Sequence, residues 1–176
     1  MNIQTLQINQ TQAQELSELA IKIYKENFMH LWHEGGAKWY IERSYHPDVI
    51  EKELADPNNL HYIAYDNQKA IAYLKIRLNE SLKYFENKNC LEVERIYILN
   101  AYKGKGLGKT LMQIADDWAL DLNKDIIFLK AMDSSTDSIA FYRKLGYKIC
   151  GMLTLPFEQM KEMYRGMVIL KKDMKA

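Results

Sequence analysis

The sequence predicts a single α/β domain over residues 1–176, built on a mixed sheet of about seven strands flanked by helices. Residues 91–123 form a strand, a glycine-spaced turn and a helix, and an apolar strand follows at 126–131. A strand, helix and strand in series usually make a right-handed parallel crossover, so these strands should be parallel neighbours. Strands at 60–65 and 70–76 flank a short polar turn, which predicts an antiparallel hairpin in the same sheet.

The remaining elements follow from apolar periodicity and from proline and glycine. Thr11 is a suitable N-cap for a helix that continues toward His30, and Gly35 and Gly36 end that segment. Pro47 suits the first position of a later helix. The other expected elements are an edge strand at 2–8, a helix at 37–45, a charged loop or short helix at 79–90, a helix near 135–145, and closing strands at 147–154 and 163–171.

The central strand and its turn are the most informative stretch. Residues 91–99 are rich in β-branched, aromatic and aliphatic side chains, as in a largely buried strand. Gly104, Gly106 and Gly108 then alternate with other residues, and an apolar helical face starts at Leu107. Glycine lets the main chain approach a ligand closely, and a helix start offers unpaired N–H groups and partial positive charge. The turn is therefore a predicted anion site.

Three lysines, Lys103, Lys105 and Lys109, surround this turn, so pyrophosphate is the ligand that it favours. The Walker pattern is absent, because it needs four residues between its first glycine and a Gly-Lys-Ser/Thr. The dinucleotide fingerprint is absent too, because its third glycine should follow the second by three positions and here follows by two.

Composition argues against several other classes. The net charge of +1 gives no general attraction to nucleic acid or anionic lipid. We find neither a secretory signal nor the roughly 18 apolar residues of a membrane span. Cys90 and Cys150 fit no metal or redox spacing, and His30 and His33 lack a third ligand. We expect a cytoplasmic protein with no metal and with no nucleic-acid or membrane partner.

Two motifs resemble the GNAT family of N-acetyltransferases. Lys103-Gly-Lys-Gly-Leu-Gly108 is similar to its acyl-CoA pyrophosphate loop, Gln/Arg-x-x-Gly-x-Gly/Ala, and Ile139-Ala-Phe-Tyr-Arg-Lys-Leu-Gly-Tyr147 resembles its later signature around Phe-Tyr-x-Lys-x-Gly-Phe. Two motifs in this order are more specific than either alone. The stretch 91–98 with Gly106-Leu-Gly-Lys109 further resembles the PaiA-like subgroup, whose members acetylate polyamines.

The resemblance covers essentially the full length and implies the GNAT fold. In that fold the strands at 91–99 and 126–131 splay apart at one end, and acetyl-CoA, the acetyl donor, lies in the gap. Main-chain groups of Ile96, Tyr97 and Ile98 would pair with the pantetheine amides, although residue type alone would favour simple buried strand. The residues that the resemblance assigns to the pyrophosphate are Lys103, Gly104, Lys105, Gly106, Leu107, Gly108 and Lys109.

By the same resemblance, Tyr142 is the expected general acid, a phenol that protonates the departing CoA thiolate. By residue type alone it would be a core aromatic beside Phe141. Lys144 is an expected phosphate contact, and an exposed helix lysine is the alternative. Lys103 stands where the family has glutamine or arginine, which keeps charge but loses a forked donor. Ser135 stands where many members have asparagine, so its shorter side chain reaches less far toward the pantetheine.

Glu94 is the expected general base, with Glu92 in reserve and water alone as a third option. Both carboxylates lie on one strand face by the two-residue period, which places Arg95 on the other face. A carboxylate buried beside an apolar cleft has a raised pKa and can take a proton from an ammonium group. The alternative for Glu94 is a salt bridge to a nearby lysine or arginine.

These residues predict an acetyl-CoA-dependent N-acetyltransferase that works by direct attack in a ternary complex. The expected acceptor is a primary amine of a small polyamine such as spermidine or spermine, held by acidic and aromatic side chains. Those side chains are Glu26, Glu34, Glu42, Asp48, Trp32, Trp39 and Tyr40. Acceptors that are peptide or protein amines, and a non-catalytic acyl-CoA-binding regulatory module, remain as alternatives. A homodimer is also open, because dimers are common in the family.

Overall fold

The computed structural model describes residues 2–174. The strands in this range form one seven-stranded sheet. The strands are β1 (Ile3–Gln7), β2 (Asn59–Asp66), β3 (Lys69–Glu80), β4 (Cys90–Ile98), β5 (Ile126–Met132), β6 (Lys148–Thr154) and β7 (Gly166–Asp173). Their order across the sheet is β1-β2-β3-β4-β5-β7-β6. The β4–β5 pair is parallel and the other neighbours are antiparallel. The predicted mixed sheet, hairpin and parallel crossover are confirmed.

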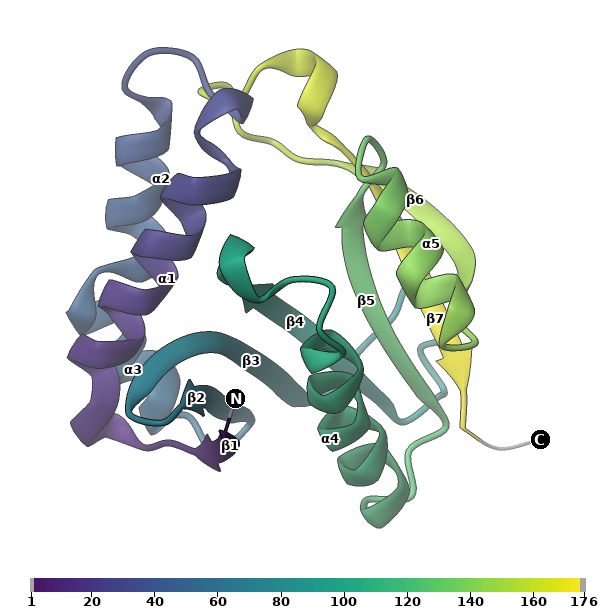
Figure 1. The fold of residues 1–176 in the computed structure, drawn as a ribbon. Coiled ribbons are helices and arrows are strands. Elements are labelled where there is room, and N and C mark those ends of the chain that lie inside the picture. Colours follow the sequence, from purple (N-terminus) through teal and green to yellow (C-terminus); the bar gives the residue numbers. More distant parts are fainter. Residues whose placement is uncertain (1, 175–176) are drawn as a thin grey trace.

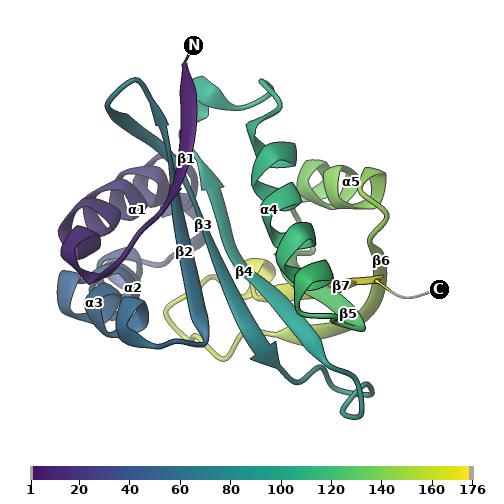
Figure 2. The same cartoon turned by 90° about the horizontal axis from the view of Figure 1, so that it is seen from below.

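Helices cover both faces of the sheet. The first three, α1 (Ala13–Asn27), α2 (Gly36–Tyr45) and α3 (Pro47–Ala55), lie on one face, and α4 (Leu107–Asp121) and α5 (Thr136–Lys144) lie on the other (Figures 1 and 2). Short 3-10 turns complete the described chain: η1 (Gln10–Gln12), η2 (Met29–Leu31), η3 (Asn100–Tyr102) and η4 (Glu162–Tyr164). The sheet is therefore the middle layer of three.

The first helix differs from its prediction at both ends. Asn9, not Thr11, is the cap, because its side chain accepts a hydrogen bond from the Thr11 N–H at 3.0 Å. The Gln12 side chain accepts in return from the Asn9 N–H at 3.1 Å, which completes a capping box. The capped turn is 3-10, so α1 begins only after it, and α1 ends at Asn27, short of His30.

The core lies on both sides of β3 and β4. Residues 71–76 of β3 are each at most 4% exposed, because helices cover both faces of the sheet. The apolar face predicted for α4 is confirmed, with Leu111 and Ala115 fully buried. One charged residue, Lys75, lies within this apolar run of β3. Its ammonium group needs a buried partner, since an unpaired charge in a core is very costly.

Strands β4 and β5 pair only along their first halves. Their parallel ladder ends at the pair Val93–Leu129. Beyond this point β4 continues beside β3 as far as Ile98, and β5 continues beside β7 as far as Met132. The two strands therefore diverge toward their C-terminal ends (Figure 1). Alternate main-chain groups of residues 94–98 face this splay without a strand partner.

Beyond the splay, the two halves of the chain meet in a contact that we call the clasp, formed by residues 28–36 and 155–165 (Figure 1). Trp32 and Met160 form an antiparallel bridge there, flanked by two backbone hydrogen bonds of 3.0 and 2.9 Å. Part of the second segment is η4, so β7 starts later than the predicted strand 163–171. The clasp fixes the N-terminal helices against the connection between β6 and β7.

We predict that Gly36→Ala weakens the clasp. A Cβ at this position would lie 2.7 Å from the main-chain oxygen of Gln159, so backbone must shift. The expected loss is about 1–3 kcal/mol in the free energy of unfolding, as for other overpacked sites. Urea denaturation measures it, with Lys38→Ala on the exposed side of α2 as the control, expected to stay within about 0.5 kcal/mol. Equal unfolding midpoints for the two variants would contradict the prediction.

Candidate active site

The chain leaves β4 through η3 and enters an exposed loop, residues 103–106, before α4. Gly104 and Gly106 have φ of +74° and +83°, and a Cβ at either would meet nothing within 4 Å. The left-handed backbone, not crowding, is thus the reason for glycine here. The first helical hydrogen bonds run from the N–H groups of Lys109 and Thr110 to the Gly106 oxygen, at 3.0 and 3.2 Å. The amides just before them belong to the first turn, which lacks intrahelical acceptors.

The third glycine has a different role. A Cβ on Gly108 would lie 3.2 Å from the Phe141 ring and 3.7 Å from the Ile98 side chain. The absence of a side chain therefore lets α4 pack closely on both β4 and α5. Gly108 therefore acts on a ligand only indirectly, by fixing the start of α4 next to the splay.

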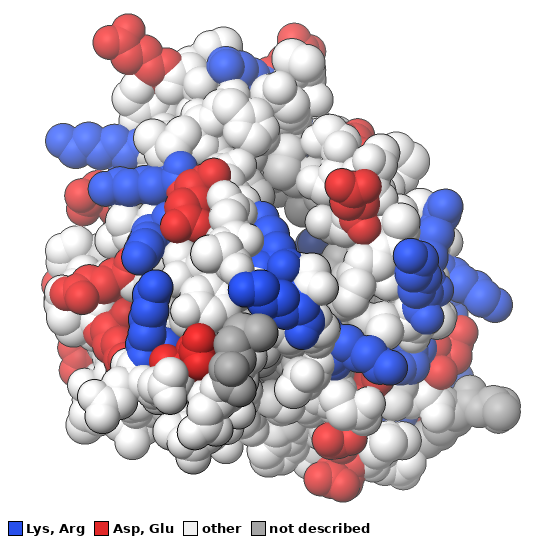
Figure 3. All heavy atoms as spheres, viewed as in Figure 1, with Lys and Arg blue, Asp and Glu red and all other residues white. Residues whose placement is uncertain are grey.

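Cations surround the loop. On the face shown in Figure 3, Lys and Arg side chains gather near the start of α4 and over α5. The Lys105 ammonium lies 5.1 Å from the centre of the Tyr102 ring. Lys103 is directed elsewhere, because its Nζ donates a hydrogen bond to Asn27 Oδ1 at 2.5 Å. Burial lowers the pKa of Lys103, and the Glu26 carboxylate acts in the opposite direction.

The last residues of β4 alternate between the two faces of the sheet. Ile98 faces α4, next to Gly108. Tyr97 faces the α1 side, where its ring packs against Phe28 and Tyr73 with centroids 5.3 and 5.6 Å apart. The main chain of residues 96–98 is therefore held from both faces while its edge stays free for a ligand.

Tyr142 lies on α5 and is only 9% exposed. Its ring packs beside Phe141 and Tyr147, with centroids 5.2 and 6.1 Å away. Burial raises the pKa of Tyr142 to about 12. Burial also raises the pKa of Tyr97, and the nearby phenols of Tyr40 and Tyr142 raise it further. Tyr142 thus keeps its proton over the neutral range and lies near the splayed end of β4.

Two further predicted cofactor contacts border α5. Ser135 precedes the helix, is half-buried, and accepts a hydrogen bond from the Ile139 N–H at 3.0 Å through its carbonyl oxygen. Lys144 is exposed near the C-terminal end of α5. Their roles toward a cofactor stay predictions.

Glu94 is the extra residue of a β-bulge in β4. The register pairs Arg95 with Lys75 and Val93 with Ile76, which leaves Glu94 without an opposite residue. The expectation that Arg95 points away from Glu94 is wrong, because Arg95 Nη2 lies 3.4 Å from Glu94 Oε1. The bulge interrupts the two-residue alternation on which that expectation rested.

Cations contact both oxygens of Glu94. Lys75 Nζ lies 3.0 Å from each, and Arg77 Nε lies 3.6 Å from Oε2. Glu92 is also paired, with Lys130 Nζ at 2.7 Å. The predicted alternative for Glu94, a salt bridge to a nearby lysine or arginine, is what the structure shows.

Sequence reasoning missed a partner of this cluster, Glu53 on α3. Its carboxylate receives a forked pair of hydrogen bonds from Arg95, at 2.8 and 3.1 Å, and lies 3.0 Å from Lys75 Nζ. Two signals could have found it. Glu53 shares the apolar face of its helix with Ile50, three residues earlier, and Lys75 is a charge inside an apolar strand.

The acidic residues expected to hold a polyamine do not converge, although the rings of Trp32, Trp39 and Tyr40 lie together. Glu34 and Asp48 flank opposite ends of α2, a helix about 15 Å long. The Glu26 carboxylate accepts a hydrogen bond from the Asn100 N–H at 3.0 Å. Trp32 is 4% exposed and donates its indole N–H to the Tyr24 hydroxyl at 2.7 Å, so it belongs to the core. An acidic slot is not formed by these groups.

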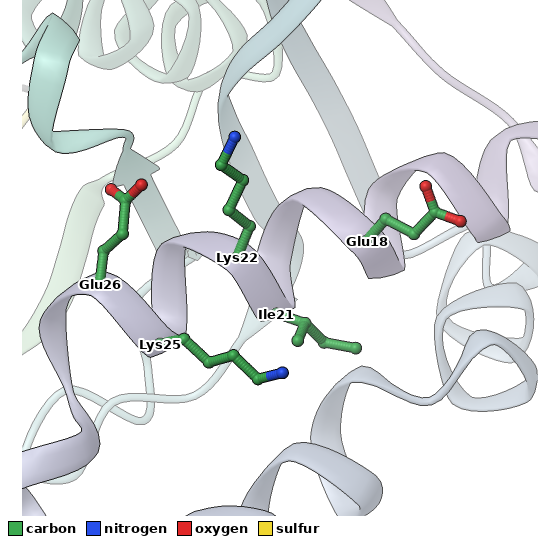
Figure 4. Close-up of a pocket in the computed structure, with 5 residues that line it drawn as sticks. All are labelled: Glu18, Ile21, Lys22, Lys25 and Glu26. Atoms are coloured by element: carbon green, nitrogen blue, oxygen red, sulfur yellow. The ribbon is translucent and has the colours of Figure 1, made fainter.

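A surface hollow is lined only by residues of α1 (Figure 4). It is lined by Glu18, Ile21, Lys22, Lys25 and Glu26. Two lysines and two glutamates balance there, so the hollow lacks the positive charge that a diphosphate needs.

Over residues 2–174 we find no group of three His, Cys, Asp or Glu side chains placed to bind a metal ion. The helices of the same range are all too short or too polar to traverse a bilayer.

The splay between β4 and β5 is thus followed by a glycine loop at a helix start, an arrangement that suits an extended ligand with an anionic end. The sequence matches the acetyltransferase (GNAT) family over residues 18–147. The chain belongs to this family.

Several known proteins resemble the chain. An uncharacterized N-acetyltransferase from the pepI 3′ region of Lactobacillus delbrueckii subsp. lactis is 26% identical over 107 residues, 61% of this chain and 62% of that protein. A streptothricin acetyltransferase of Streptomyces lavendulae is 31% identical over 62 residues, 35% of this chain and 33% of that protein. The N-alpha-acetyltransferase RimI of Mycobacterium tuberculosis is 28% identical over 107 residues, 60% of this chain and 63% of RimI. The chain thus spans less than two thirds of each relative.

Among solved structures, the PaiA N-acetyltransferase of Thermoplasma acidophilum in complex with coenzyme A has a similar fold. The TM-score is 0.77 at 18% identity, and the match covers 98% of this chain and 99% of that one. At this identity the likeness establishes the fold.

We predict that Gly106→Val reduces affinity for coenzyme A by at least about tenfold, because β-branched residues strongly disfavour φ of +83° and the loop must rearrange. Isothermal titration measures the dissociation constant. Gly146→Val is the matched control, since its φ is +91° but it lies beyond α5, outside the loop. Both variants should lose stability, and only the first should lose affinity. Equal affinities for the two variants would remove the loop from the binding site.

Proposed function

We propose that the protein transfers the acetyl group of acetyl-CoA to a primary amine by direct attack in a ternary complex. The observation that carries this proposal is the free edge of residues 94–98, which leads directly into the glycine loop. A pantetheine chain carries two amides and fits a strand edge, and its diphosphate would fall at the N–H groups that start α4. The loop is open to solvent around Gly104 and Gly106, so it has room for that ligand.

The transfer requires a neutral amine, a polarised thioester and a proton for sulfur. In our proposal the amine nitrogen attacks the thioester carbon, the C–S bond breaks, and Tyr142 donates its proton to the sulfur. The nitrogen gives up its extra proton to solvent, and the Tyr142 phenolate regains a proton from solvent. An N–H group among residues 96–98 stabilises the oxygen of the tetrahedral intermediate. Because the pKa of Tyr142 is about 12, its phenol is in the proton-donating form at every pH at which the protein would be assayed.

The attacking amine must lose a proton, and two acceptors of that proton are in question. Glu94 remains a candidate, but its two oxygens are occupied by Lys75 and Arg77. Water alone is the alternative that this charge pattern favours, because an amine can lose its proton to solvent before it binds. The activity should then rise with pH up to the pKa of the acceptor amine.

A small polyamine such as spermidine or spermine is the acceptor that we propose first, on the resemblance of residues 91–98 and 106–109 to the PaiA-like subgroup. A peptide or protein amine is the second candidate. Two observations favour the second: acidic residues do not converge into a slot, and one relative is named an N-alpha-acetyltransferase.

An acceptor panel distinguishes these candidates. Release of the CoA thiol would be followed with purified protein, acetyl-CoA and, in separate reactions, spermidine, spermine, streptothricin and peptides with free N-termini. The proposal expects release above the amine-free rate with at least one acceptor class. Preference for polyamines supports the first candidate, and preference for peptides supports the second. No release with any of these acceptors would reject the proposed transfer to these classes of amine.

We predict that Tyr142→Phe lowers kcat by about 100-fold or more, the usual contribution of a general acid, and leaves coenzyme A affinity unchanged. Tyr147→Phe is the matched control, because that phenol is also buried and its ring packs against Tyr142. Steady-state kinetics and calorimetric titration measure the two quantities. If Tyr142→Phe keeps full activity, the phenol is a core group and not the acid.

Three other expectations remain proposals. We propose a single acetyltransferase domain over residues 1–176. We also propose a cytoplasmic location, because Cys90 and Cys150 are free thiols, which a reducing compartment favours. A homodimer is an open alternative to a monomer.

A further inference from the structure

The bulge and the splay coincide in β4. Pairing with β5 ends at Val93, and the next residue, Glu94, is the bulge. From this point β4 has one neighbouring strand instead of two, and a bulge bends a strand and increases its twist. The direction of residues 94–98 therefore depends on the β3 ladder and on contacts from the adjoining helix layer.

Side chains from the bulge connect it to α3. Arg95 donates two hydrogen bonds to Glu53, at 2.8 Å from Nη1 and 3.1 Å from Nη2. Lys75 Nζ lies 3.0 Å from Glu53 Oε1 and 3.0 Å from Glu94 Oε1. Glu53 thus links the bulge residue's neighbour, the facing strand β3 and a helix of the adjoining layer.

The cluster is largely shielded from solvent. The side chains of Lys75 and Arg95 are 4% and 12% exposed, and those of Glu53 and Glu94 are 19% and 24% exposed. Arg95 also lies over the Tyr45 ring, 5.3 Å from its centre. Arg77 Nε also lies 3.6 Å from Glu94 Oε2, so three cations surround two carboxylates, and loss of the Glu53 carboxylate would leave Lys75 and Arg95 with Glu94 alone.

His61, which lies beside Glu53, does not add a further positive charge to the cluster. It is 2% exposed, and burial lowers its pKa, although Glu53 acts in the opposite direction. Its Nε2 lies 3.7 Å from Glu53 Oε2, beyond hydrogen-bond distance. Burial alone would raise the pKa of Glu53, but His61, Arg95 and Lys75 outweigh it and lower the value to about 2. Glu53 is an anion at every physiological pH.

We propose that Glu53 is a positioning residue for acetyl transfer, which aims the main chain of residues 96–98 across the splay by holding Arg95 at the β4 bulge. In this proposal Glu53 acts through Arg95 and not by contact with a substrate. The inference rests on the proposed function for its catalytic consequence, and its structural part stands independently. The fork from Arg95 fixes an angle that a single contact would leave free.

The test is Glu53→Gln, which keeps the size and one acceptor but removes the charge. Glu51→Gln is the matched control, because Glu51 is exposed on the same helix. The expected result is a fall in kcat of about 100-fold, as for a small misplacement of reacting groups, with the dissociation constant of coenzyme A changed less than about threefold. Glu51→Gln should match the natural protein.

A second readout does not depend on turnover. Amide hydrogen exchange measured by NMR should become at least about tenfold faster at residues 94–98 in Glu53→Gln, relative to residues 90–93, which keep their β5 ladder. If the natural protein acetylates none of the tested amines, the proposed function fails and this exchange still decides the inference. Unchanged exchange at residues 94–98 overturns the inference, whatever the kinetics.

Conservative variants separate positioning from general loss of stability. Glu53→Asp keeps the charge and should recover part of kcat and of exchange protection. Arg95→Lys keeps the charge but loses the forked hydrogen bonds, and it should show the same fall in kcat and the same faster exchange that we expect of Glu53→Gln. Arg95→Lys therefore serves as the test if Glu53→Gln does not fold. If Glu53→Asp is no better than Glu53→Gln, or if Arg95→Lys behaves as the natural protein, the proposed role is overturned.

Discussion

The structure depends on one constraint, the end of the parallel ladder between β4 and β5 at Val93 and Leu129. A sheet of this kind would ordinarily continue to pair, since unpaired main-chain groups are costly when buried. Here both strands continue, but each keeps its other neighbour. The gap that results is bordered by one free strand edge and by the start of α4, on which α5 packs. Strand, loop and helix therefore lie around one gap.

The clusters around the gap divide by chemistry. On the α4 side, small and apolar groups such as Gly108 and Phe141 allow close approach of the helices. On the α3 side, a buried ionic cluster surrounds the bulge at Glu94. Ion pairs in a protein interior add little net stability, because desolvation offsets their attraction. Their directional bonds are better explained as a means to fix one geometry of a bent strand.

Sequence reasoning predicted the parts that rest on local pattern. The strand at 91–99, the glycine turn and the apolar face of α4 have strong periodic signals, and the parallel crossover follows from chirality. It did not predict the bulge, because an extra residue in one strand is visible only against its partner. For that reason Arg95 was assigned to the wrong face. The acidic residues near α2 were grouped by sequence distance, although a helix separates Glu34 from Asp48. The partnership of Glu53 with Arg95 joins positions 42 apart and leaves only a weak local trace.

The loop that starts α4 presents backbone, not side chains, at Gly104 and Gly106, and what those positions demand is a permitted dihedral angle. A binding surface made of peptide groups is the same in every sequence that can adopt the angle. The need to keep such a backbone shape restricts the residue type at only a few positions, and the neighbouring positions can vary. The Thermoplasma structure and this chain share one fold at 18% identity, which shows how few side chains such a shape prescribes.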